Sequence, residues 1–588
     1  MNTLKRWTYT AVIPTAIYNE PCLFHLSENG RWVVSASVKD RQLTVLVRTY
    51  AKDAPLTLTA DLTKYTSVSA DKSSDSAVVE LIWLGYRLEL WINGIMAEEE
   101  WPMGESFTQD DPVIRCASCM ISHNWIPDAA QKPFNPRPIK DILFWAPDIG
   151  NENVGDCMPF SDGERYHLFY LKDRHSHTSK WGKGAHQFAH ISTKDLVNWE
   201  EHPMAVEITH PWEGSICTGS ILKTNDKYYA FYAARMMDET AAQLSWAVSD
   251  DGIHFTKSEQ YFALTAPYET TSARDPEVFL GADGLYHMLV TTNLADCEIP
   301  ERSGCLAHLV SADLENWEQK EPFLVPGYTD QPECSDYFEW NGWYYLIFSN
   351  YGLAKYRYSR NPFGPWITPA NETIGGPLYR VPKTADFADR RIAAGFLAAS
   401  VTGESYAGSV VLRELLQNKD GTLRFSHVKE LLPETAGCHS AVTESSVSNA
   451  YSQAHLCDGS WYLSCKIESS GSNYGLLLTT ANGRYEIRLN AADRYITVCP
   501  AHAALYNYSN TMRTLVNVED LDRPCSLSVF WKNGVLDLCL NDRYTLCCRL
   551  ESPQMAAADP LPPVWECYVK DGKAVFHACT ADNNGSGK

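Results

Sequence analysis

The feature that most constrains the fold is an aromatic strand pattern that recurs in the middle of the chain. The segments YHLFYL, YYAFYA, YHMLVT and YYLIFS begin at Tyr166, Tyr228, Tyr286 and Tyr344, at intervals of 62, 58 and 58 residues. A repeat of this length with several strands per unit predicts the blades of a β-propeller, in which equivalent positions surround one axis. A fifth, weaker unit is expected over residues 384–400.

Polar turns follow three of the four repeats. Their sequences are STKDLVNWEEHP, SDDGIHFTKSEQ and SADLENWEQKEP, and each runs from a serine through acidic residues to an aromatic side chain. Turn-forming residues at a fixed place after each aromatic strand indicate that the repeat unit is a set of antiparallel strands.

Period-2 alternation of apolar and polar residues dominates both ends of the chain as well. GRWVVSASVKDRQLTVLVRTY near the start and CSLSVFWKNGVLDLCLNDRYTLCCRL near the end are typical of half-buried strands. A proline-rich stretch, IPDAAQKPFNPRPIKD, marks a boundary. We therefore expect an all-β chain with a β-sandwich-like domain at 1–135, a five-bladed propeller at 136–425 and a C-terminal β-sandwich at 426–588.

Composition excludes several function classes. The formal charge of -22 argues against nucleic acid or an anionic membrane as a partner. The chain contains neither an apolar run of spanning length nor a recognisable signal peptide. Its 18 cysteines are scattered, many of them within apolar runs, which favours reduced, buried thiols in a cytoplasmic protein.

Three carboxylates occupy similar places in the repeats. Asp156 lies 10 residues before Tyr166, and Asp275 and Glu333 each lie 11 residues before the tyrosine of their own repeat. Thr218 stands at this place in the second repeat, either as a wall of the site or as a structural turn. If this place belongs to the innermost strand of each blade, the three acids meet at one end of the channel. Taken singly, each acid is more simply explained as a turn residue or an N-cap.

The segment TSARDPEVF gives one of these acids a cationic neighbour. Arg274 would offset the repulsion among clustered carboxylates, and Pro276 biases Asp275 toward an extended backbone. Paired carboxylates of this kind suit hydrolysis of a glycosidic bond, in which one carboxylate attacks or activates water and a protonated one donates to the leaving oxygen.

These motifs resemble those of glycoside hydrolase family 32, the β-fructosidases. SARDPEVF and QPECSDYFEWNGWYYLIFS are similar to the family's Arg-Asp-Pro and Glu-Cys motifs, and CTGSIL is similar to its Ser-Gly-Ser segment. The resemblance covers roughly residues 145–400. It implies a five-bladed propeller joined to a β-sandwich and a retaining, double-displacement mechanism that releases fructose from short fructo-oligosaccharides or sucrose-like substrates.

The resemblance also implies residue roles. Asp156 matches the nucleophile, Glu333 the general acid/base, and Asp275 the transition-state stabiliser supported by Arg274. Trp181 falls near a substrate-lining tryptophan of the family, or is a core residue of the propeller. The chain departs from the family in VGDCMPFSDG around Asp156, in Phe188 and His190, and in Leu171, where a glutamine is common.

Other functions remain open at this point. A family-43-like arabinosidase or xylosidase would use a similar propeller with inversion. A fructosyltransferase would share the covalent intermediate, and a carbohydrate-binding protein would bind sugar without turnover. HSHTSK holds two histidines without a clear third ligand, so we expect neither a metal nor a cofactor. A sandwich domain is a candidate for homodimer formation.

Overall fold

The described residues of the computed structural model form β-strands and three short 3-10 turns, joined by loops, and contain no α-helix. The turns are η1 (Leu62–Lys64), η3 (Pro300–Arg302) and η4 (Lys429–Leu431). The structure describes residues 7–14, 19–28, 30–49, 52–65, 76–83, 88–101, 113–116, 120–125, 138–147, 152–174, 185–210, 212–444, 449–451, 460–480, 482–501, 513–552 and 564–581. The expectation of an all-β chain is confirmed for these residues.

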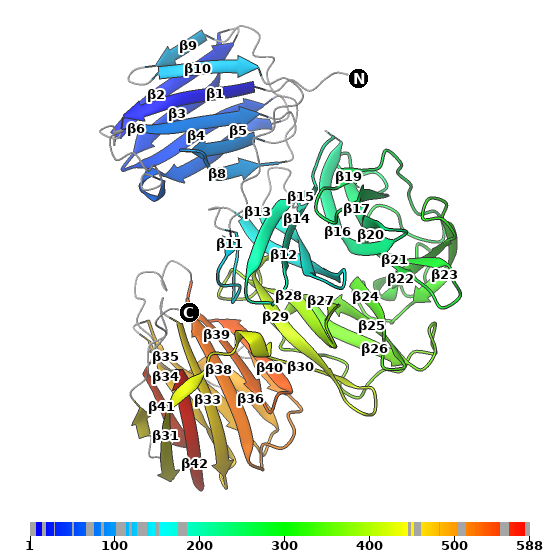
Figure 1. Cartoon of the computed structure of the whole chain (residues 1–588), viewed down its shortest axis with the longest axis vertical. Coiled ribbons are helices and arrows are strands. Elements are labelled where there is room, and N and C mark those ends of the chain that lie inside the picture. Colours follow the sequence, from blue (N-terminus) through cyan, green and yellow to red (C-terminus); the bar gives the residue numbers. More distant parts are fainter. Residues whose placement is uncertain are drawn as a thin grey trace.

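Two five-stranded sheets form the N-terminal part, drawn in blue in Figure 1. The first has the order β10-β1-β6-β7-β8, with β1 (Trp7–Pro14), β6 (Ser76–Trp83), β7 (Leu88–Ile92), β8 (Ile95–Glu100) and β10 (Met120–Trp125). The second has the order β5-β4-β3-β2-β9, with β2 (Asn19–Glu28), β3 (Arg31–Lys39), β4 (Gln42–Thr49), β5 (Lys52–Asp61) and β9 (Val113–Cys116). Both sheets contribute to one apolar core, so they pack face to face.

The end of β8 attaches this N-terminal part to the centre of the chain. Trp101 is fully buried in an apolar cluster with residues of the central sheets, including Leu171. Beside it, the Lys172 ammonium forms ion pairs with Glu99 and, at 3.0 Å, with Glu152. A buried lysine needs such partners, because desolvation of an isolated charge is expensive.

The central part contains one 12-stranded sheet and two four-stranded sheets, which follow one another around a centre in Figure 1. The large sheet comprises β11 (Pro138–Ile139), β12 (Glu152–Ser161), β13 (Tyr166–Arg174), β14 (Gln187–Thr193), β15 (Trp199–Val206), β24 (Glu333–Trp340), β25 (Trp343–Asn350), β26 (Leu353–Ser359), β27 (Arg380–Phe387), β28 (Arg390–Ala398), β29 (Gly408–Gln417) and β30 (Leu423–Ser426). The small sheets comprise β16 (Glu213–Thr224), β17 (Lys227–Met236), β18 (Gln243–Ser249) and β19 (Thr256–Lys257), and β20 (Arg274–Leu280), β21 (Tyr286–Asn293), β22 (Gly304–Ser311) and β23 (Glu318–Leu324).

The predicted polar turns are present and share one geometry. The carboxylates of Asp195, Asp251 and Asp313 each accept hydrogen bonds from backbone N–H groups two and three residues further along the chain. In two of these turns the residue after the aspartate, Leu196 or Leu314, has a positive φ and packs in the core. The same local hydrogen bonds therefore end equivalent strands in three successive repeats.

The C-terminal part consists of two six-stranded sheets, coloured yellow to red in Figure 1. One has the order β31-β42-β33-β38-β39-β40, with β31 (Thr435–Glu444), β33 (Ser460–Ser469), β38 (Cys525–Lys532), β39 (Val535–Leu540), β40 (Tyr544–Arg549) and β42 (Lys573–Ala581). The other has the order β32-β41-β34-β35-β36-β37, with β32 (Asn449–Tyr451), β34 (Asn473–Thr479), β35 (Arg484–Asn490), β36 (Tyr495–Pro500), β37 (Thr514–Val516) and β41 (Val564–Val569).

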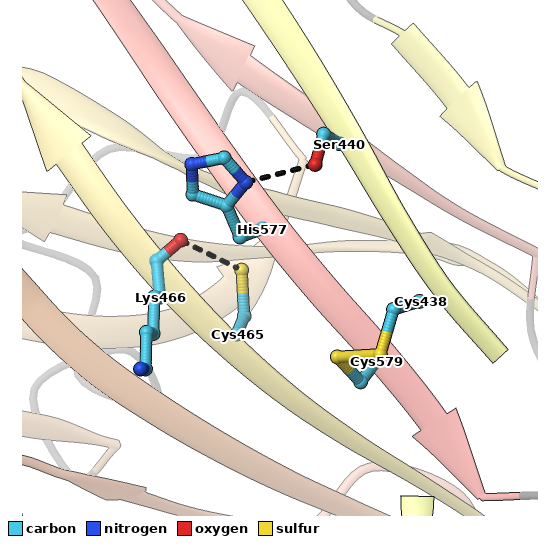
Figure 2. The surroundings of a disulfide bond; sticks show 6 residues. All are labelled: Cys438, Ser440, Cys465, Lys466, His577 and Cys579. Atoms are coloured by element: carbon cyan, nitrogen blue, oxygen red, sulfur yellow. Dashed lines mark hydrogen bonds between the residues drawn. A yellow bond between two sulfur atoms is a disulfide. The ribbon is translucent and has the colours of Figure 1, made fainter. Parts of the chain in front are cut away.

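A disulfide joins two neighbouring strands of this C-terminal part. Cys438 on β31 and Cys579 on β42 lie directly opposite each other and are covalently linked, as Figure 2 shows. The expectation that the cysteines are reduced is therefore wrong for this pair, because cross-strand register places two thiols from distant parts of the sequence side by side. Twelve other cysteines whose side chains the structure describes are free, and all but Cys297 are buried.

A buried charge cluster joins the central and C-terminal parts. Arg413 on β29 pairs with Asp537 on β39 at 2.6 Å, and both side chains are almost completely buried. His427 Nε2 lies 3.4 Å from the other carboxylate oxygen of Asp537. Burial raises the pKa of the Asp537 carboxyl, but Arg413 and the nearby His427 lower it by more, so the group stays ionised inside the protein.

We predict that Asp537→Ala destabilises the chain strongly. Removing this carboxylate leaves Arg413 as a buried, uncompensated charge, a change that typically costs about 3–5 kcal/mol. Calorimetric thermal unfolding measures the effect as a lower midpoint. Asp250→Ala is the matched control, because Asp250 forms an exposed pair with Lys227, and its midpoint is expected to stay close to that of the unaltered chain. Equal midpoints for Asp537→Ala and the control would contradict this interpretation.

Candidate active site

Three acids from distant parts of the sequence line one pocket. Asp156 on β12, Asp275 on β20 and Glu333 on β24 face a cavity of about 530 Å³, and Arg274 and Thr218 line it with them. The structure thus brings together five of the six residues singled out from the sequence. The sixth, Trp181, lies outside the described residues.

β-Bulges direct these side chains into the pocket. Five strands each have a register shift beside the pocket: β12 between Val154 and Cys157, β16 between Cys217 and Ser220, β20 between Arg274 and Glu277, β24 between Glu333 and Asp336, and β27 between Arg380 and Lys383. In each case two residues stand opposite one on the partner strand. A bulge of this kind re-aims side chains and is common beside active sites.

The bulges explain why pocket residues come in adjacent pairs. Consecutive residues of a regular strand point to opposite faces of the sheet, so only one of them could reach the pocket. At the bulges both members of a consecutive pair line the cavity, namely Cys217–Thr218, Arg274–Asp275, Glu333–Cys334 and Arg380–Val381. Asp275, Cys334 and Val381 have positive φ angles of 58°, 51° and 48°, which marks the residue that turns out of the regular strand. The expectation that Pro276 gives Asp275 an extended backbone is therefore wrong, because the bulge holds Asp275 in the left-handed region.

The equal spacing of Asp275 and Glu333 before their tyrosines does not reflect equal positions. Arg274 pairs with Thr291 and Glu333 pairs with Ser349, and both partners lie five residues beyond the tyrosine of their repeat. Glu333 is therefore the structural equivalent of Arg274, one position before the bulge. The hairpin that precedes Tyr286 is one residue longer than the hairpin that precedes Tyr344. This extra residue is why Asp275 and Glu333 lie equally far before their tyrosines although their positions in the strands differ.

Asp156 is held by three hydrogen bonds of different kinds. Thr218 Oγ1 donates to Asp156 Oδ2 at 2.6 Å, and the Cys334 thiol donates to the same oxygen at 3.5 Å. The backbone N–H of Asp156 donates to Tyr406 Oη at 3.2 Å. Thr218 is consequently a wall of the site within β16 rather than a turn residue, which decides between the two alternatives left open by the sequence.

Arg274 connects the other two acids. Its Nη2 donates to Glu333 Oε1 at 2.6 Å, and its Nε lies 3.6 Å from Asp275 Oδ2. The backbone N–H of Cys334 donates to that same oxygen of Asp275 at 3.2 Å. The adjacent Arg and Asp are thus not a surface pair: both are largely buried, and one guanidinium offsets the repulsion between two carboxylates.

Burial raises the pKa values of two of the acids. For Asp156 burial is the largest effect, the hydrogen bond from Thr218 opposes it, and the charge of Asp275 adds to it. For Glu333 burial again raises the pKa, Arg274 lowers it, and Asp275 raises it further. The Glu333 side chain is still 31% exposed, so it can exchange protons with solvent. The pocket therefore combines a carboxyl that retains its proton to higher pH with closely spaced negative charge.

Several residues that the sequence did not single out line the same pocket. They are His186, Ser215, Arg235, Arg380 and Tyr406. Each comes from a segment where the sequence gives no local signal of chemistry, and only the sheet order brings them to the cavity. The one clue to these residues was a charged residue inside an apolar strand: Asp173, which contacts His186, ends the run YHLFYLKD and is fully buried.

The described part of the chain contains no helix able to cross a membrane.

We predict that Asp156→Asn stabilises the fold at neutral pH. A carboxyl whose folded-state pKa is raised favours the folded state only while it is protonated, so its cost appears as pH rises above about 4 and grows until the folded-state pKa is passed. Removing the charge should raise the unfolding free energy by about 1–2 kcal/mol at pH 7. The gain should vanish near pH 3, where the acid is protonated in both states. A gain that is the same at pH 3 and pH 7, in thermal unfolding at each pH, would refute this.

Comparisons with known proteins agree with this architecture. The family described as glycosyl hydrolases family 32 N-terminal domain matches residues 156–367. Sucrose-6-phosphate hydrolase of Escherichia coli is 25% identical over 353 residues, which cover 54% of this chain and 70% of that protein. The enzyme of the same name from Vibrio alginolyticus is 22% identical over 448 residues, covering 69% of this chain and 84% of the relative.

Solved structures share the fold at low sequence identity. Fructan 1-exohydrolase IIa from Cichorium intybus superposes with a TM-score of 0.60 at 13% identity, covering 77% of this chain and 98% of that one. Sucrose-6-phosphate hydrolase from Lactobacillus gasseri gives a TM-score of 0.56 at 19% identity, covering 74% and 93%. Residues 156–367 are thus similar to the N-terminal domain of glycoside hydrolase family 32, and the curated relatives and the shared fold agree with that similarity.

Proposed function

We propose that this chain is a retaining glycoside hydrolase that releases fructose from β-fructofuranosides, either short fructo-oligosaccharides or sucrose-like substrates. The observation that supports it most is the convergence of Asp156, Asp275 and Glu333 on one pocket, with Arg274 between two of them. Clustering carboxylates is costly, so their convergence on one pocket supports a role in chemistry.

Each acid has a role that its surroundings favour. Asp156 is the nucleophile that attacks the anomeric carbon, and the hydrogen bond from Thr218 favours its ionised form. Glu333, with a raised pKa and partial access to solvent, donates a proton to the leaving oxygen and later takes one from water. Asp275 accepts hydrogen bonds from ring hydroxyls, and its negative charge favours the oxocarbenium-like transition state.

We also propose the domain arrangement expected from the sequence, with a five-bladed propeller at 136–425 between an N-terminal domain at 1–135 and a C-terminal β-sandwich at 426–588. Each sheet takes its strands from one of these ranges, with β30 ending at the second boundary. Within the 12-stranded sheet, β12 joins β29 and β26 joins β27 through single residue pairs, which suits separate blades that touch at their edges. A homodimer through a sandwich domain and a cytoplasmic location stay predictions.

We predict that the unaltered chain releases fructose from sucrose, inulobiose or levanbiose and that Asp156→Ala and Glu333→Ala abolish most of this activity. Loss of a general acid/base typically lowers kcat by about 10²–10⁴-fold, and loss of the nucleophile should cost at least as much. Chromatography of the released sugars measures both effects. Undiminished turnover by Asp156→Ala would rule out the proposed mechanism.

The same assay separates the alternatives when methanol is added as an acceptor. A retaining fructosidase gives methyl β-fructofuranoside, whereas an inverting arabinosidase or xylosidase acts on arabinosides or xylosides and inverts the configuration. A fructosyltransferase gives longer oligosaccharides in place of free fructose. Binding of sugar without any product would identify a carbohydrate-binding protein.

A phosphorylated sucrose is a second candidate substrate, favoured by two further guanidinium groups in the pocket. Arg235 and Arg380 line the cavity, and Arg380 is fixed there because its Nη1 and Nη2 donate to the carbonyls of Tyr351 at 3.0 Å and Gly403 at 3.3 Å. Guanidinium groups are well suited to phosphate. The curated relatives named above are sucrose-6-phosphate hydrolases.

We predict that Arg235→Gln or Arg380→Gln raises KM for sucrose 6-phosphate about tenfold or more and changes KM for sucrose much less. One charge-assisted hydrogen bond is worth roughly that factor. Arg360→Gln is the matched control, because Arg360 is exposed and does not line the pocket. If all variants treat the two substrates alike, the substrate is not phosphorylated.

A further inference from the structure

A hydrogen-bonded row of three buried residues ends in the pocket wall. Asp173 Oδ1 lies 3.0 Å from His186 Nε2, and His186 Nδ1 lies 3.2 Å from Ser215 Oγ. The backbone N–H of His186 also donates to Ser215 Oγ at 3.0 Å. Asp173 lies at the end of β13, His186 lies just before β14, and Ser215 lies on β16, so the row spans two sheets.

The row lies close to Asp156. His186 and Ser215 line the same cavity as Asp156, and the three members of the row are 0%, 6% and 2% exposed. The His186 ring packs against the ring of Tyr406 with 5.1 Å between centroids, and Tyr406 Oη accepts the hydrogen bond from the backbone of Asp156. A sugar ring bound at Asp156 therefore lies beside this row.

Ser215 has hydrogen-bonding capacity left for a ligand. A hydroxyl offers one donor and two acceptor sites, and the two contacts with His186 use two of these three. When His186 is neutral and Nε2–H donates to Asp173, the Ser215 hydroxyl donates to Nδ1 and keeps one acceptor site. When His186 is doubly protonated, Nδ1–H donates to Ser215, which keeps its own O–H as a donor. Since Ser215 is buried and lines the cavity, a ligand in the pocket can use the remaining site.

Not every part of the pocket wall can supply such a contact. Leu171 lines the pocket as well, and its side chain presents only C–H groups. A sugar ring carries several hydroxyls, and each one buried without a partner costs affinity.

We propose that Ser215 binds a hydroxyl group of the sugar ring held at Asp156, with His186 and Asp173 as positioning residues that orient it. This inference rests on the proposed function and names a further specificity-determining residue for the same reaction. Ser215 recognises a polyhydroxylated ring through one hydrogen bond, and the buried Asp173 carboxylate fixes the orientation of the imidazole behind it.

The first test compares KM and kcat of purified full-length variants on the fructoside that the unaltered chain hydrolyses best. Ser215→Ala should raise KM about tenfold, since one hydrogen bond is worth roughly that factor, and should change kcat by less than about threefold. Asp173→Asn should shift KM in the same direction by a smaller factor. Ser245→Ala is the matched control, because Ser245 is equally buried but bonds to the Gln260 carbonyl outside the pocket.

The second test uses fructosides that lack one ring hydroxyl each. For the unaltered chain, kcat/KM on one of them should be about tenfold lower than on the parent fructoside, because the hydroxyl it lacks is the one that Ser215 binds. For Ser215→Ala, kcat/KM on the same deoxy substrate and on the parent fructoside should differ little. A purely structural role of Ser215 would lower activity on all the deoxy substrates alike and would overturn the proposal. If Ser215→Ala does not fold, the same series measured with Asp173→Asn decides the question.

Failure of the two proposals can be told apart. If the unaltered chain hydrolyses no fructoside, the proposed function is wrong and this inference falls with it. If it hydrolyses a fructoside and Ser215→Ala keeps the unaltered KM, only the role of Ser215 is wrong. Labelling of Ser215 by a fluorophosphonate would assign it a nucleophilic role in place of the binding role.

Discussion

A buried ion pair at the centre of the molecule fixes the strands that bear the site. Lys383 on β27 donates to Glu277 on β20 at 2.6 Å and to the Gly219 carbonyl on β16 at 2.9 Å. On the same strand as Lys383, Thr384 donates through both its backbone and its hydroxyl to Asp336 on β24. A displaced strand would leave a charge buried and unpaired, which is far more costly than losing an apolar contact. Four of the five bulged strands are thereby held in register with one another.

The site inherits its geometry from these fixed strands. Each of the contacts just described involves a residue at or directly beyond a bulge, so the ion pair and the pocket lie on the same strands a few residues apart. Burial and the neighbouring ammonium act in opposite directions on Glu277: burial raises the pKa of its carboxyl, Lys383 lowers it, and the result is a pKa of about 7. The protein therefore keeps two layers of ionisable groups at its centre, one that holds strands together and one that faces the pocket.

The sequence could predict those features of the fold and the pocket whose residues form a recognisable pattern along the chain. The repeat and its turns are short patterns that recur along the chain, and the place of Asp156, Asp275 and Glu333 in those repeats predicted their convergence. The equivalence of Asp275 and Glu333 was misjudged because a hairpin loop differs by one residue, which strand pairing reveals and spacing conceals. His186 and Ser215 had no local signal, because their partners come from other strands. The disulfide between Cys438 and Cys579 depends on strand register in the same way.

The adjacent Arg and Asp of the sequence can now be understood as a consequence of backbone geometry. A regular strand would send Arg274 and Asp275 to opposite faces of the sheet, and the guanidinium could not reach the carboxylates it stabilises. The bulge turns both toward the pocket, and Glu333, one position before the bulge of the next sheet, meets Arg274 there. In this chain the charged pair before Pro276 and an apolar strand thus marks a bulge that faces the pocket. The same reasoning applies to Glu333–Cys334, where the acid reaches the pocket and its neighbour's backbone N–H binds Asp275.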